Sequence, residues 1–105
     1  MSFSQRRTSL LRVLEIESNI KDIEHGDEYL RVKREIKLLE NARNGSGRIV
    51  VSSPNDMSTT VELRKNSADV EQYLSLYRVR MRGVSDRIDS LNVEKFNLKR
   101  ELMSG

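Results

Sequence analysis

The side chains that most often catalyse reactions or bind metals are scarce in this chain. Its 105 residues include one histidine, His25, and no cysteine, so neither a histidine cluster nor a thiolate site is available to hold zinc. Serines are plentiful, but none lies in a glycine-flanked nucleophile elbow, and no glycine-rich phosphate loop occurs. The sequence therefore predicts a non-enzymatic protein with no catalytic residue, metal or cofactor.

Carboxylates are frequent enough to pair, and Glu15, Glu17, Asp22 and Glu24 lie close together in the sequence. Two carboxylates act as general acid and base only where burial or a neighbouring charge separates their pKa values. The sequence predicts no concave apolar pocket around them, so we interpret them as solvated charges on a helix face. The chain is then expected to act by binding, and its apolar residues decide how.

An uninterrupted heptad pattern runs from Val70 to Leu102. Its residues recur at alternating steps of four and three, the spacing of a coiled-coil seam. The seam positions are Val70, Leu74, Tyr77, Met81, Val84, Ile88, Leu91, Lys95, Leu98 and Leu102. A helix cannot bury its own stripe, so this helix must pack against another. Lys95 is the polar exception, and we interpret it either as specifying register or as extending its charge to water.

A second long helix is predicted between Ser4, which suits an N-cap, and residue 43. Its apolar stripe shifts phase at Gly26, which indicates either a short turn between two helices or a local irregularity within one. We favour one helix. The apolar positions expected to face the other arm are Val13, Ile16, Ile20, Ile23, Val32, Ile36 and Leu39.

Between the helices the pattern changes to that of extended chain. The segments 48–52 and 59–64 are rich in β-branched residues, and the residues 53–56 between them favour a turn. These features predict a β-hairpin, and a mobile loop is the alternative. An isolated two-stranded hairpin is marginal in water, so we expect this one to pack on the helices or to pair with another copy.

Together the segments predict a single, mainly α domain over residues 1–105. It is an elongated antiparallel helical hairpin, or coiled coil, with a small β-hairpin between the two long helices. The first helical arm covers 4–43, the loop and β-hairpin cover 44–66, and the second arm covers 67–103.

The basic residues are spread along the sequence. The chain carries 19 basic and 16 acidic residues, a formal net charge of +3, and the ranges 1–44, 45–66 and 67–105 each carry +1. Nucleic-acid-binding domains usually gather their cations on one face. A small basic helical dimer that binds nucleic acid is therefore an alternative to the main hypothesis, and its candidate contacts are Arg31, Lys33, Arg34, Lys37, Arg78, Arg80 and Arg82.

The composition limits the remaining possibilities. Apolar residues make up 36% of the chain, with two Phe and no Trp, which is too little for a deep globular core at this length. No apolar run approaches the roughly 20 residues that span a bilayer, so we predict no membrane span. We also expect no small-molecule substrate, because the sequence predicts no concave apolar pocket. The lack of cysteine fits a reducing compartment, and we expect an intracellular protein, cytoplasmic or nuclear.

The apolar residues exceed what one contact between two helices buries. Tyr73, Leu76, Val79, Val93 and Phe96 on the second arm lie outside the seam, as do Leu11, Leu30 and Leu38 on the first. A second interface is implied, with another copy or with a helical partner. The sequence therefore predicts an oligomerisation, scaffold or adaptor protein that acts through helix–helix packing.

The order helix, β-hairpin, helix resembles that of the small subunits of prefoldin. In that family paired helical arms project from a β platform and hold unfolded client proteins. The resemblance implies a client-binding chaperone subunit as a further alternative. Apolar residues near the free ends of the arms would then contact clients, and here these are Leu10, Leu11, Leu98, Leu102 and Met103.

Overall fold

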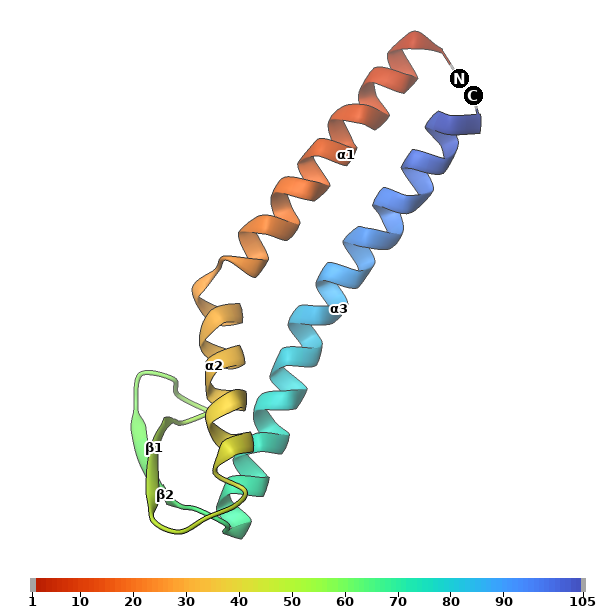
Figure 1. Ribbon diagram of the computed structural model, residues 1–105. Coiled ribbons are helices and arrows are strands. Elements are labelled where there is room, and N and C mark those ends of the chain that lie inside the picture. The colour runs from red at the N-terminus through yellow and green to blue at the C-terminus, as the bar shows by residue number, and fades with distance from the viewer. Residues whose placement is uncertain (1, 105) are drawn as a thin grey trace. The chain divides into compact units, whose positions relative to one another are not determined.

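The computed structural model describes residues 2–104 and contains three helices and one two-stranded sheet (Figure 1). The elements, in chain order, are α1 (Phe3–Glu24), α2 (Asp27–Asn41), β1 (Arg48–Ser52), β2 (Thr60–Arg64) and α3 (Ala68–Ser104). The predicted fold class is confirmed, because long helices flank a small antiparallel β-hairpin. Within residues 2–104, no helix is both long and apolar enough to cross a membrane.

The first helical arm is two helices and not the single helix that we favoured. α1 ends at the C-cap His25, whose N–H donates to the carbonyl oxygen of Lys21 at 2.9 Å. The next residue, Gly26, lies so close to the preceding turn that a Cβ would come within 3.0 Å of the Asp22 carbonyl oxygen. Asp27 then opens α2 with an acidic first turn, which the helix dipole favours.

The start of α1 also differs from the prediction, since Ser2 and not Ser4 is the N-cap. The Ser2 hydroxyl oxygen accepts from the Gln5 N–H at 3.2 Å, and the Gln5 side chain accepts from the Ser2 N–H at 2.9 Å. This reciprocal pair is a capping box. Gln5 was the signal for it, because a Gln or Glu three residues after a serine marks such a start.

The helices pair as two compact units. Unit 1 consists of α1 with the part of α3 from Val84 onward, and unit 2 is Asp27–Gly83. In unit 1, Val13, Ile16 and Ile20 are buried on α1 and Val84 is buried on α3.

Ion pairs join the two helices of unit 1 on both sides of this apolar contact. Arg12 of α1 binds Glu94 of α3, with Nη2 and Oε2 2.7 Å apart. Glu17 of α1 approaches Lys99 of α3, with Oε1 and Nζ 3.6 Å apart. These contacts fix the antiparallel register of the two helices.

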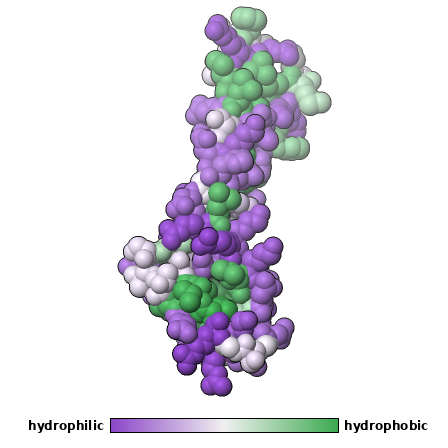
Figure 2. Space-filling view, turned by 60° about the vertical axis from the view of Figure 1, so that its left-hand side comes forward, coloured by the Kyte–Doolittle hydropathy of each residue, from purple (hydrophilic) through white to green (hydrophobic). Residues whose placement is uncertain are grey.

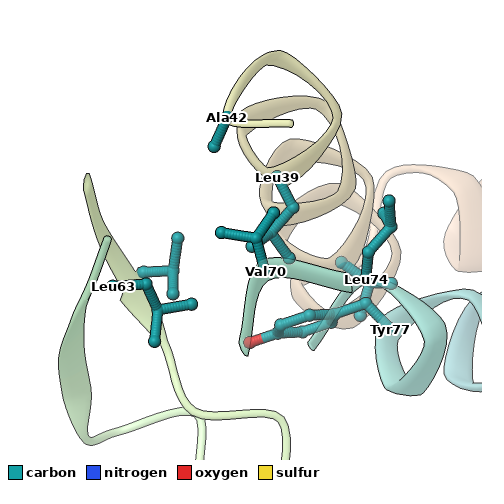
Figure 3. Close-up of a cluster of buried hydrophobic side chains, with 8 residues drawn as sticks. Leu39, Ala42, Leu63, Val70, Leu74 and Tyr77 are labelled. Atoms are coloured by element: carbon teal, nitrogen blue, oxygen red, sulfur yellow. The ribbon is translucent and has the colours of Figure 1, made fainter. Parts of the chain in front are cut away.

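Unit 2 holds the main core, which lies between α2, the β-hairpin and the first part of α3 (Figure 3). Leu39 from α2, Ala42 directly after it, Leu63 from β2, and Val70, Leu74 and Tyr77 from α3 converge there. Val32 of α2 and Val51 of β1 complete the buried cluster. The residues between α2 and α3 therefore form an ordered β-hairpin that packs on the helices, and not the mobile loop that was the alternative.

The hairpin has one face on the core and one in solvent. Register pairs place Ile49 opposite Leu63 and Val51 opposite Val61, and these four side chains are buried or half-buried. Arg48, Val50, Glu62 and Arg64 alternate with them and are exposed, as a half-buried strand pair requires. Gly45 and Gly47, with φ of 94° and 99°, turn the chain from α2 into β1 in a conformation that favours glycine.

Candidate functional site

The predicted seam residues of unit 2 lie in its core. Val70, Leu74 and Tyr77 on α3 and Val32 and Leu39 on α2 are buried, and Ile36 and Met81 are half-buried against them. The aromatic ring of Tyr77 is fully buried. These residues hold the unit together, so they are not free to bind a partner.

The predicted seam residues of unit 1 are less well covered. Val13, Ile16, Ile20 and Val84 are buried, whereas six further positions are half-buried: Ile23, Ile88, Leu91, Lys95, Leu98 and Leu102. Lys95 lines a shallow groove together with Glu17, Glu24 and His25. A two-helix contact thus leaves part of the unit 1 seam accessible.

A polar site that the sequence did not predict lies where the helices of unit 2 meet the hairpin. The Ser52 N–H donates to the Glu35 carboxylate at 3.2 Å, and the Tyr77 hydroxyl donates to the Ser52 carbonyl oxygen at 2.6 Å. Glu35 is only 2% exposed, and Ser52 is buried as well. Both backbone groups of one buried residue are therefore satisfied by side chains from two different helices.

Two arginines extend this site along the hairpin turn. Arg31 of α2 donates to the carbonyl oxygen of Met57 at 2.6 Å, and Arg80 of α3 donates to that of Pro54 at 2.8 Å. We call Arg31, Glu35, Tyr77 and Arg80 the hairpin anchor, because all four bind main-chain atoms between Ser52 and Met57. In the described part of the chain, every buried side-chain nitrogen or oxygen has a hydrogen-bond partner.

The anchor explains the electrostatics of Tyr77. Burial raises the pKa of its phenol, and the nearby charge of Glu35 raises it further, whereas the charges of Arg80 and Arg31 act in the opposite direction. A phenol with a raised pKa remains protonated and continues to donate its hydrogen bond. The group therefore serves as a structural donor and not as an acid or base.

One signal in the sequence indicated this site. Glu35 lies three residues after Val32 and four before Leu39, which places a carboxylate on the apolar stripe of the helix. A charged residue in that position requires a buried partner. The identity of the partner depends on where the hairpin folds back, which local pattern does not specify.

The seven predicted nucleic-acid contacts separate into two groups. Arg31 and Arg80 bind the hairpin, and Arg34 lies 3.6 Å from the Glu35 carboxylate. The remaining four are exposed and lie on both helices of unit 2: Lys33, Lys37, Arg78 and Arg82. The structure thus brings together only part of the predicted set.

The described residues offer little else that supports a reaction. Between residues 2 and 104, no group of three or more histidine or acidic side chains is placed to hold a metal ion. An open groove of about 880 Å³ lies along unit 1, with Ile23 and Leu91 among polar residues in its lining. Such an open groove suits the docking of a side chain or helix better than the enclosure of a substrate.

Comparisons with known proteins give no match. No protein-family model, no curated protein and no solved structure matches this chain.

Proposed function

We propose that this chain is a non-enzymatic interaction module that oligomerises, or organises partner proteins, through helix–helix packing. The observation that carries the proposal is a cluster of exposed apolar side chains in unit 1. Leu10, Leu14, Phe96 and Met103 are 53%, 61%, 63% and 89% exposed. Large apolar residues that gather on one face of a soluble protein mark an interaction site.

The ion pair between Glu17 and Lys99 shows that these four residues share a face. Leu14 and Leu10 precede Glu17 by three and seven residues, so all three lie on one side of α1. Phe96 and Met103 lie three residues before and four residues after Lys99, on one side of α3. We call these four residues the apolar face. Figure 2 shows apolar surface at the end of unit 1 that carries the chain termini.

A second copy is the partner that we propose first. Two such faces in contact form a four-helix arrangement, in which half-buried seam residues such as Leu98 and Leu102 are covered further. The test is light scattering after size-exclusion chromatography over a wide range of concentrations. The double variant Leu14→Gln, Phe96→Gln is expected to shift the population toward the monomer without a loss of helix content.

A matched control is Leu30→Gln in α2, because Leu30 is similarly exposed but belongs to unit 2. It should leave the oligomeric state unchanged. A chain that stays monomeric at every concentration contradicts self-association.

A client-binding chaperone subunit is the second candidate, supported by the exposure of Leu10, Leu11 and Met103 where α1 begins and α3 ends. Leu98 and Leu102, which the resemblance to prefoldin also implied, are half-buried. Suppression of the aggregation of a thermally unfolded protein tests this candidate. The double variant Leu11→Gln, Met103→Gln, which changes two of these residues, should lose that activity.

A further inference from the structure

The net charge of the chain lies entirely in unit 2. Unit 1 contains eight basic and eight acidic residues, whereas unit 2 contains eleven basic and eight acidic residues, which gives the whole +3. Counting along the sequence hides this difference, because α3 contributes residues to both units. Unit 2 is therefore the basic part of the chain, and the positions of its cations decide what it attracts.

Four of these cations lie on one face of the α2–α3 pair. Lys33 follows the buried Val32 by one position, and Arg78 follows the buried Tyr77 by one position. Successive residues of a helix lie about 100° apart around its axis. In an antiparallel pair of helices, the residues that follow the contact residues by one position therefore lie on the same face of the pair. Lys37 and Arg82 lie one turn further along their helices. We call these four residues the basic face.

The basic face is turned away from the hairpin. Lys33 lies two residues from both Arg31 and Glu35 of the hairpin anchor, which is about 200° around α2. Arg78 and Arg82 each lie two residues from Arg80, which also binds the hairpin. The hairpin therefore covers the opposite side of the helices and leaves the basic face open.

Five other cations of unit 2 lie within 4 Å of an acid, and these are Arg31, Arg34, Arg43, Arg48 and Arg80. Arg31, Arg43 and Arg48 contact Asp27, Glu71 and Glu62, and Arg80 lies 3.5 Å from Glu28. Among residues 2–104, no carboxylate is seen within 4 Å of Lys33, Lys37, Arg78 or Arg82. Glu71 borders the face; Arg43 binds its carboxylate with two hydrogen bonds, and the nearby charge of Arg78 also helps to lower the pKa of Glu71. Like charges one turn apart destabilise a helix, so an external anion would relieve the repulsion.

We infer that the basic face binds the phosphate backbone of double-stranded nucleic acid. Lys33 and Arg78 lie at about the same level of the pair, as the ion pairs Arg43–Glu71 and Arg80–Glu28 indicate. Because the helices are antiparallel, Lys37 and Arg82 lie one turn away from that level in opposite directions, so the four cations extend about 12 Å along helices that pack about 8–10 Å apart. About 12 Å of duplex axis carries about seven phosphate charges, which is enough for each of the four cations to contact one. The inference is independent of helix–helix binding by the apolar face.

The same face does not suit a single strand. Single-strand sites stack bases on aromatic side chains. Tyr29 is the aromatic residue one turn before Lys33, and the Lys33 ammonium already lies over its ring, 5.7 Å from the centroid. Contacts to phosphates alone would make the binding independent of base sequence.

The test is fluorescence anisotropy with labelled duplexes of DNA and RNA at several salt concentrations. With four phosphate contacts, the slope of log K against log salt is expected near about −3.6, so affinity falls about 150-fold between 50 and 200 mM salt. Lys33→Gln with Lys37→Gln should halve the slope, so that affinity falls only about 12-fold over the same range. Arg78→Gln with Arg82→Gln should have the same effect.

The matched control is Arg48→Gln with Arg64→Gln, which removes two exposed charges from the hairpin side of unit 2. It should leave the slope near that of the unaltered chain, and circular dichroism should show that all variants remain folded. Lack of duplex binding at 50 mM salt, or equal slopes for control and basic-face variants, would overturn the inference. Preferential binding to phosphatidylserine vesicles, lost in the basic-face variants, would also overturn it, since the face would then contact lipid.

Discussion

The Tyr77 hydroxyl lies 2.6 Å from the carbonyl oxygen of Ser52, a buried contact between α3 and the end of β1. Replacement of Tyr77 by Phe leaves this carbonyl without its donor, and we expect unfolding by urea to require about 1–3 kcal/mol less free energy. Tyr73→Phe is the matched control, because Tyr73 is half-buried on the same helix. An equal loss in both variants would contradict the assigned role of the contact.

The same tyrosine predicts a loss of stability in alkali. The folded protein raises the pKa of Tyr77 above its ordinary value of 10.0, so at higher pH the unfolded chain releases this proton first. The stabilisation is complete below pH 10 and decreases as pH rises toward the pKa of the folded state. Chemical denaturation between pH 8 and about 11 should therefore show the stability difference between the unaltered chain and Tyr77→Phe shrinking with pH. A constant difference would contradict the raised pKa.

Glu35 should respond differently to two substitutions. Glu35→Ala removes the acceptor of the buried Ser52 N–H and is expected to cost about 1–3 kcal/mol of unfolding free energy. Glu35→Gln retains a side-chain oxygen and should cost less. Glu40→Ala, at an exposed position of the same helix, should stay within about 0.5 kcal/mol of the unaltered chain. If Glu35→Gln and Glu35→Ala are equally harmful, the negative charge matters more than the hydrogen bond.

Two glycines should respond to alanine with opposite signs. A Cβ at Gly83, inside α3, meets no other atom within 4 Å, so Gly83→Ala should stabilise the chain by about 0.5–1 kcal/mol. A Cβ at Gly26 would lie 3.0 and 3.2 Å from the carbonyl oxygens of Asp22 and Ile23, so Gly26→Ala should destabilise it. Thermal unfolding followed by circular dichroism measures both. A stabilising Gly26→Ala would show that the turn after α1 relaxes without cost.

Local pattern predicted the elements of this fold with few errors. The heptads from Val70 predicted α3, and β-branched residues predicted the strands 48–52 and 59–64, where the structure has Arg48–Ser52 and Thr60–Arg64. The continuous first helix was the main error. The phase shift at Gly26 was visible in the sequence, but whether backbone geometry breaks the helix there depends on the contacts around it.

The roles of individual polar residues were harder to predict than the elements. Arg31 and Arg80 looked like surface cations, because nothing in their local sequence shows that a hairpin turn lies against them. The four residues of the basic face were among the seven candidate contacts, but the sequence did not separate them from Arg31, Arg34 and Arg80. The row of Lys33 and Lys37 lies more than 40 positions from the row of Arg78 and Arg82, and only the pairing of α2 with α3 brings the two rows together.

The hairpin anchor recognises main-chain atoms, and this affects how the turn tolerates change. Peptide groups are common to all amino acids, so an exposed turn residue such as Asn55 contributes little to the attachment of the hairpin to the helices. Its identity is free to change while the path of the chain is retained. A fluorophore or epitope introduced at Asn55 should therefore report on binding events without loosening the fold that carries it.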